Sequence, residues 1–237
     1  MNLTKEVWSQ KDIPVFLSYL KTLSKGEYKS TWEQRIVNTS LPCLAIPSTE
    51  IDRIAREIYK GNYESYLDLN IWSNHSATLV YGKILNKIKD YDKLIKYIIP
   101  YSERADNWST IDCLKFKFTD SNIPKFIELS KKLIQSKHPF SRRLSLIILL
   151  KLLSVTDCTD IAFEIISSLK YEEEYYVNMA AAWLLAECMT RHRDKTLDYY
   201  EIVNTNAFIV NKSISKCRDS YRITKEDKER LLRYKIK

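Results

Sequence analysis

Apolar residues recur at helical spacing along almost the whole chain, in short segments that follow one another in pairs. Val15, Leu20 and Leu23 mark the first of these segments, and Ser48 and Gly61 are placed to begin and end the third. A pair of helices this short cannot bury its apolar face alone, so each pair must stack on the next. The segments lie at about 15–23, 28–37, 48–60, 74–88, 91–101, 108–118, 120–134, 141–153, 160–169, 175–190, 197–203, 206–218 and 224–234.

About six pairs follow one another with a period near forty residues, which is the size of a HEAT-type unit. The pattern therefore predicts an all-α fold, a superhelical solenoid of HEAT-like helical pairs with a concave basic surface. The chain has only 3 glycines and 6 prolines, too few for the frequent turns of a β-sandwich or a Rossmann-like sheet. No linker interrupts the array, so residues 1–237 are expected to form a single domain. A closed helical bundle, with fewer and longer helices, is the alternative.

Positive charge points to the class of partner. Lysine and arginine number 38 against 30 acidic residues, a formal net charge of +8. An excess of this size favours a polyanion, with nucleic acid as the first candidate, although a basic surface can also serve only solubility. No G-x-G-x-x-G or Walker-type loop occurs, so we expect no nucleotide cofactor.

The cysteines and histidines do not form a metal-binding pattern in sequence. The 5 cysteines are scattered without a C-x-x-C, and His75, His138 and His192 lie far apart, so we expect no zinc site. Scattered cysteines, odd in number, are typical of a protein in the reducing cytoplasm. The N-terminus has no apolar signal-like region, and the longest apolar run is interrupted by Lys151 and is too short to span a bilayer. These features predict a protein of the cytoplasm that does not associate with membranes.

The stretch from Tyr101 to Phe118 carries the first candidate site. Asn107 is placed to cap a helix opened by Trp108, and Asp112 follows four residues later on the same face. An indole and a carboxylate would then project together, away from the core. The structural alternative is a partly buried tryptophan beside an aspartate that favours the helix dipole. The residues expected to face the core of this helix are Ile111, Leu114 and Phe118.

Two arginines open an otherwise apolar helix further along the chain. Arg142 and Arg143 place positive charge at the N-terminus of this helix, where the helix dipole disfavours it. A purely structural role therefore explains them poorly. A planar guanidinium suits a phosphate contact, whereas a salt bridge to a neighbouring carboxylate is the structural alternative.

Trp183 and a basic cluster complete the candidates. Trp183 shares a helical face with Tyr176, Ala180 and Glu187, although a lone tryptophan is more often a core residue. A cluster of basic residues lies near Tyr221. A row of contacts to DNA phosphates and a solvated basic face explain this cluster equally well. Its members are Lys212, Lys216, Arg218 and Arg222.

Taken together, these stretches resemble the HEAT-like-repeat DNA alkylation repair glycosylases of the AlkD type. Four motifs in order carry the resemblance, which runs from about Pro47 to the C-terminus. They are W-x-x-x-D at Trp108, R-R-L-S-L-I at Arg142, M-A-A-A-W-L-L-A-E at Met179 and S-I-S-K-C-R-D-S-Y-R at Ser213. The chain departs from the family pattern in CLAIP, ending at Pro47, and in WSNHS, where Asn74 and His75 replace acidic residues.

The resemblance implies a solenoid that cups duplex DNA containing alkylated purines and hydrolyses the N-glycosidic bond of cationic N3- and N7-alkylpurines. It implies no metal and no organic cofactor, and we expect a monomer. It assigns the catalytic aspartate to Asp112, the lesion-facing tryptophans to Trp108 and Trp183, and the phosphate-contacting arginine to Arg143, with Arg142 as an adjacent competitor. Lys212, Lys216 and Arg222 are further candidates for phosphate contacts.

The function expected from the sequence is thus a DNA glycosylase of base excision repair. A non-catalytic relative that binds DNA of unusual structure is the first alternative. A HEAT-type scaffold that binds a polypeptide is the second, and its binding would depend little on salt.

Overall fold

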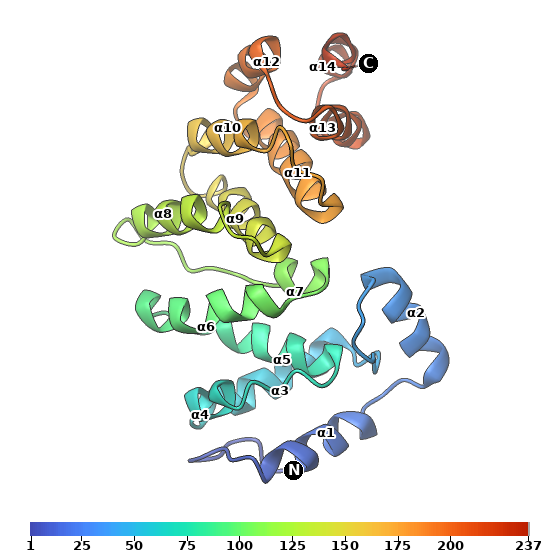
Figure 1. Ribbon diagram of the computed structural model, residues 1–237, viewed down its shortest axis with the longest axis vertical. Coiled ribbons are helices and arrows are strands. Elements are labelled where there is room, and N and C mark those ends of the chain that lie inside the picture. The colour runs from blue at the N-terminus through green and yellow to red at the C-terminus, as the bar shows by residue number, and fades with distance from the viewer. Residues whose placement is uncertain (237) are drawn as a thin grey trace. The chain divides into compact units, whose positions relative to one another are not determined.

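The regular structure of residues 1–236, which the computed structural model describes, consists of fourteen α-helices and one short 3₁₀ helix, without a strand (Figure 1). The all-α fold class is confirmed. The contacts of the chain divide it into two compact units, Met1–Lys115 and the remainder from Phe116. The arrangement as a single domain with a concave basic surface stays a prediction. None of the helices within residues 1–236 is long and apolar enough to cross a membrane.

The first unit is organised around α5 (His75–Leu85), which packs against helices on either side of it in the chain. Nearly every residue of α5 is buried, which explains why it lacks the polar stripe of a surface helix. The helices that contact it are α1 (Asp12–Thr22), α3 (Ser48–Lys60), α6 (Tyr91–Arg104) and α7 (Trp108–Asp112), while α4 (Tyr63–Asp68) packs on α3.

The second unit is a two-layer stack. One layer consists of α9 (Pro139–Leu152), α11 (Tyr175–Arg191) and α13 (Ala207–Asp219), with α11 packed against both of the others. The other layer consists of α8 (Ile123–Leu133), α10 (Thr159–Ser168) and α12 (Arg193–Ile202). The layers are visible in Figure 1 as two neighbouring columns of helices. The chain ends with α14 (Lys225–Leu231) and η1 (Leu232–Tyr234).

Small side chains let the layer of α9, α11 and α13 pack closely. Ala180, Ala181 and Ala182 follow one another on α11 and are all fully buried. Helix α9 is buried almost all round, as its apolar sequence predicted. Each pair in this unit therefore buries its apolar surface on the next pair, which is the packing expected of HEAT-like units.

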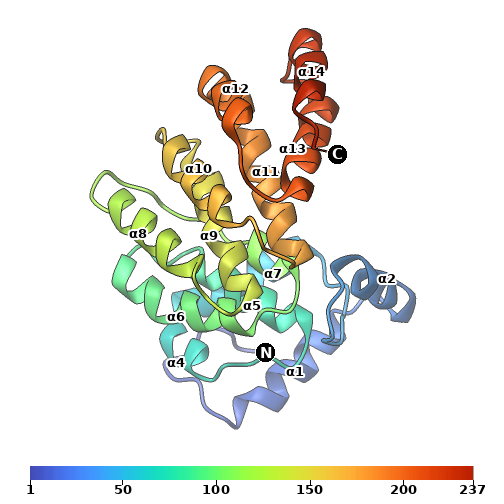
Figure 2. The same cartoon turned by 45° about the horizontal axis from the view of Figure 1, so that its top comes forward.

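Helix α2 (Glu27–Val37) is the exception, because only Val37 of its residues is buried. Tyr28, Trp32 and Ile36 are all exposed, Trp32 to 61%. Figures 1 and 2 both show α2 at the margin of its unit, apart from the other helices. Specific polar contacts rather than apolar burial must hold it in place.

Helix ends follow the sequence signals with some differences. Gly61 ends α3, and a Cβ there would meet the backbone of Lys5, so glycine allows the N-terminal segment to pass close by. Thr224 caps α14 by accepting a hydrogen bond from the Asp227 backbone N–H. Ser48 was predicted to cap α3, but the cap position is Pro47. The sequence pattern also missed α4.

Candidate nucleic-acid interface and catalytic residues

Helix α7 carries two of the predicted site residues and is only five residues long. Asn107 caps it as predicted, with its side-chain oxygen accepting a 3.0 Å hydrogen bond from the Thr110 backbone N–H. The sequence predicted a helix continuing to Phe118, and this was wrong. Helix α7 ends at Asp112 because the Asn86 side chain bonds the Cys113 carbonyl oxygen at 2.9 Å and the Lys115 N–H at 2.7 Å. These are backbone groups that a longer helix would have used.

Of the residues expected on the core face of this stretch, two behave as predicted. Ile111 and Leu114 are fully buried. Phe118 instead lies beyond the helix, where its ring packs edge-on against Phe126 of α8 with ring centroids 5.1 Å apart. The chain therefore leaves the helix after α7, and its next aromatic residues, Phe116 and Phe118, pack on the buried Phe126 of the second unit.

A buried tyrosine fixes α7 against its neighbours. The Tyr101 hydroxyl of α6 lies 3.1 Å from the carbonyl oxygens of both Thr78 and Thr110, between which it shares its proton. Burial raises the pKa of Tyr101 well above its ordinary value, so the hydroxyl remains a donor. Gly82 makes room for it, since a Cβ at that position would meet the hydroxyl.

Asp106 ties the residues before α7 to the segment that follows α2. Its carboxylate accepts hydrogen bonds from the Thr39 hydroxyl at 2.9 Å, from the Ser40 backbone N–H at 2.7 Å and from the Asn107 amide at 2.9 Å. Burial opposes ionisation, yet the hydrogen bonds from Asn107, Ser40 and Thr39 lower the pKa of Asp106. Asp106 is a structural anion that the sequence analysis did not single out.

Trp108 and Asp112 lie one helical turn apart on α7, and both are only partly buried. The Trp108 indole N–H donates a 3.3 Å hydrogen bond to the carbonyl oxygen of Ile36, near the end of α2. This contact orients the indole on the helix that also carries the carboxylate. Neither residue is a core residue, which fits both the predicted site and the structural alternative of a partly buried tryptophan beside an aspartate. Their catalytic roles stay predictions.

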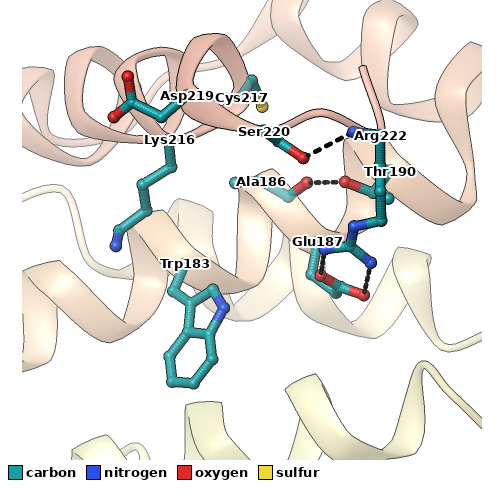
Figure 3. Close-up of a pocket in the computed structure, with 9 residues that line it drawn as sticks. All are labelled: Trp183, Ala186, Glu187, Thr190, Lys216, Cys217, Asp219, Ser220 and Arg222. Carbon is teal, nitrogen blue, oxygen red and sulfur yellow. Dashed lines mark hydrogen bonds and ion pairs between the residues drawn. The ribbon is translucent and has the colours of Figure 1, made fainter.

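Trp183 lies on α11 at the mouth of a pocket of about 310 Å³ (Figure 3). It is 38% exposed, so the alternative of a core tryptophan is excluded. Figure 3 shows the Lys216 side chain extending from α13 toward Trp183, with Glu187 and Arg222 on the far side of the pocket. The other residues that line the pocket are Ala186, Thr190, Cys217, Asp219 and Ser220.

Positive charge is concentrated beside this pocket. Partial burial lowers the pKa of Lys216, and the nearby charges of Lys212 and Arg143 lower it further, against a smaller opposing effect of Asp219. These three cations come from α9 and α13, which flank α11. Arg143 is 5% exposed, and its guanidinium donates to the Tyr176 carbonyl oxygen. A bound anion would relieve the mutual repulsion of these charges.

The other two candidate arginines are engaged by carboxylates. Arg142 makes a two-pronged contact with Glu172, at 2.7 and 3.0 Å, and also donates to the Ser136 carbonyl oxygen. Arg222 makes a similar contact with Glu187, at 2.7 and 3.1 Å. The salt bridge that the sequence left open for Arg142 is therefore present, and Arg222 holds the wall of the Trp183 pocket. Their roles in phosphate binding stay predictions.

The candidate residues thus form two groups, Trp108 with Asp112 in the first unit and Trp183 with Lys216, Lys212 and Arg143 in the second. Comparison with known families covers both units. Residues 18–215 match the family model described as "DNA alkylation repair enzyme". The chain belongs to this family. No curated protein matches the chain. The DNA alkylation repair match supports a role in DNA repair and extends nearly thirty residues further toward the N-terminus than the motif resemblance does.

Proposed function

We propose that this protein is a DNA glycosylase that hydrolyses the N-glycosidic bond of cationic N3- and N7-alkylpurines in duplex DNA. The observation that carries the proposal is the position of Trp108 and Asp112, one helical turn apart on a capped helix. Neither side chain belongs to the hydrophobic core. Membership of the DNA alkylation repair enzyme family supports it. So does a second partly exposed tryptophan, Trp183, beside a cluster of cations.

Asp112 supplies the electrostatic part of the mechanism. Alkylation at N3 or N7 leaves the purine positively charged, so the base departs as a neutral molecule and needs no general acid. The sugar then acquires oxocarbenium character, as in glycoside hydrolysis. The Asp112 carboxylate stabilises this developing cation and positions the water that attacks it.

The two tryptophans act on the cationic lesion. The face of an indole carries negative π density, and its attraction for a nearby cation contributes about 0.5–2 kcal/mol. The hydrogen bond from Trp108 to the Ile36 carbonyl fixes one indole before substrate arrives. Trp183 presents the second from the edge of its pocket.

The phosphates of the DNA backbone are bound by Lys216, Lys212 and Arg143. Their charges repel one another in the free protein, and a phosphate removes that repulsion. Arg142 and Arg222 rank below the two lysines, because each would have to share or release its carboxylate partner.

The test is single-turnover release of an N7-alkylated purine from duplex DNA by wild-type protein and by Asp112→Asn. The substitution keeps the shape of the side chain but removes its charge, so the rate should fall on the order of 10²–10³-fold. DNA affinity should hold or rise slightly, since a negative charge near phosphates is lost. Asp198→Asn, which removes the same charge from an exposed position on α12, is the matched control and should retain the wild-type rate.

Equal rates for wild-type and Asp112→Asn protein would remove Asp112 from the mechanism. If wild-type protein binds the duplex but releases no base from any cationic lesion, the non-catalytic DNA-binding alternative replaces the glycosylase.

A further inference from the structure

Three side chains of metal-ligand type meet in the interior of the first unit. They are Glu33 of α2, Cys43 in the segment before α3, and His75, the first residue of α5. One potential ligand atom of each lies within 4.8 Å of the others, and the Nδ1 atom of His75 is 3.1 Å from Oε1 of Glu33. Their positions in the sequence gave no indication of a site, because the three residues come from separate segments of the chain.

The backbone around these residues holds them together. The N–H of His75 donates to the Pro42 carbonyl oxygen at 3.0 Å, and the N–H of Ala45 donates to the second carboxylate oxygen of Glu33 at 2.8 Å. Ala45 adopts a positive φ of 51°, which alanine rarely does. The segment from Pro42 to Ala45 is thus curled around the Glu33 carboxylate and fixed to the start of α5.

Hydrogen bonding alone leaves this cluster incomplete. His75 is 1% exposed, and its Nε2 atom is buried without a hydrogen-bond partner among the described residues. Buried polar atoms are normally paired, so the described residues leave the hydrogen-bonding capacity of this imidazole only partly used.

We propose that Glu33, Cys43 and His75 bind a zinc ion. A thiolate, an imidazole and a carboxylate are the three ligand types that zinc takes in proteins. Around a tetrahedral zinc ion they would stand roughly 3.3–3.8 Å apart, so shifts on the order of 1 Å would bring the three atoms into place. The thiol proton of Cys43 passes to solvent on binding, while the neutral imidazole keeps its proton on the nitrogen that does not bind zinc. The two anionic ligands then balance the charge of the ion, and water takes the fourth position.

The expected role of this ion is to hold α2 in place. Val37 is the only buried residue of that helix, so Glu33 is its main attachment to the interior. Helix α2 in turn provides the Ile36 carbonyl that orients Trp108. The zinc site is independent of the proposed glycosylase activity, although its loss should loosen the first tryptophan of that site.

Cobalt binding to the intact, untagged and reduced chain, stripped beforehand with a chelator, tests the proposal. Co²⁺ should bind one per chain and produce a near-ultraviolet thiolate-to-cobalt charge-transfer band, which zinc should abolish by competition. Cys43→Ser should lose the band. Cys217→Ser, which alters a buried cysteine of α13 in the second unit, is the matched control and should retain it. Hydrogen exchange over residues 27–37 should slow on zinc addition to wild-type protein.

No band with wild-type protein, or a band that survives in Cys43→Ser, would overturn the proposal. If Cys43→Ser fails to fold by circular dichroism, His75→Gln takes its place. This variant keeps the thiol but lacks the imidazole ligand, so its zinc affinity should fall by more than the roughly 10–100-fold that an outer-shell partner contributes. Unchanged zinc affinity in His75→Gln would overturn the proposal equally.

Discussion

At the scale of single residues, Lys216 combines a cost to folding with a proposed role in phosphate binding. Its pKa is lowered by burial and by the charges of Lys212 and Arg143, so its ammonium group destabilises the folded state. The unfolded chain therefore binds the Lys216 proton more tightly than the folded chain does. The resulting loss of folding stability is full at neutral pH and declines as the pH rises from the folded toward the unfolded pKa of Lys216. Lys216→Met should therefore raise Tm slightly at pH 7.

The same substitution should weaken binding to all duplex sequences alike and reduce the log–log salt slope by about one. Fluorescence anisotropy of labelled duplex at several salt concentrations measures both effects. Lys132→Met, at an exposed position of α8, is the control. Unchanged affinity and slope in Lys216→Met would exclude a phosphate contact at this residue.

Glu187 makes the opposite contribution to stability. Hydrogen bonds from Arg222 lower its pKa, and Arg191 adds to the effect against the burial that opposes it. A lowered carboxylate pKa stabilises the fold above the unfolded value, about 4.3, and the contribution is lost as the pH falls through the folded value. Glu187→Gln should cost about 1–3 kcal/mol at pH 7, and the difference from wild-type protein should shrink below about pH 4.

Urea unfolding at pH 7 and at successively lower pH measures this difference. The exposed Glu226 of α14 provides the control, since Glu226→Gln should change stability little at any pH. A constant difference between wild-type and Glu187→Gln protein across this range would show that the charge of Glu187 does not stabilise the fold.

At the scale of elements, α7 is too short to be stable without its cap and its packing. Asn107→Ala removes the cap and the hydrogen bond to Asp106, so the free energy of unfolding should fall by about 1–2 kcal/mol. Because Trp108 and Asp112 both lie on α7, single-turnover base release should slow as well. Asn62 caps α4 in the same way, so Asn62→Ala should lose similar stability but keep the wild-type rate.

Equal rates for the Asn107→Ala and Asn62→Ala variants would mean that the cap of α7 serves stability only. Comparing two caps of the same residue type separates a general loss of stability from a specific loss of geometry. The comparison also tests whether the rate depends on how α7 is held.

At the scale of the whole molecule, the net charge of +8 should make binding to duplex DNA fall steeply with salt. A polypeptide-binding scaffold would show little salt dependence beyond surface screening. Titration of the same labelled duplex from low to high salt distinguishes the two. An affinity for duplex that does not change with salt would contradict a nucleic-acid interface.

Whether the two units form one cooperative domain is a further prediction at this scale. Trp8, Trp32, Trp72 and Trp108 lie in the first unit, and only Trp183 lies in the second. In Trp183→Phe protein, tryptophan fluorescence therefore reports on the first unit, whereas far-ultraviolet circular dichroism reports on both. Since the family match spans the division, the two unfolding curves in urea should coincide. Separate midpoints would show two domains.

Local signals in the sequence were enough to predict the all-α class, most of the helices and the separation of Trp108 and Asp112 by one helical turn. Helical spacing of apolar residues, the cap at Asn107 and a separation of four residues are local properties, and they hold wherever the segment is placed in the fold. The all-α class and the cap of α7 followed from such signals.

The end of α7, the partners of the arginines and the surroundings of Glu33 depend instead on contacts between distant segments. The Asn86 side chain that ends α7 is 27 residues from Cys113, and Arg222 meets Glu187 across 35 residues. Glu33 and His75 meet across 42 residues. A local pattern cannot specify such contacts, because they form only when the packed helices bring distant segments within hydrogen-bond reach.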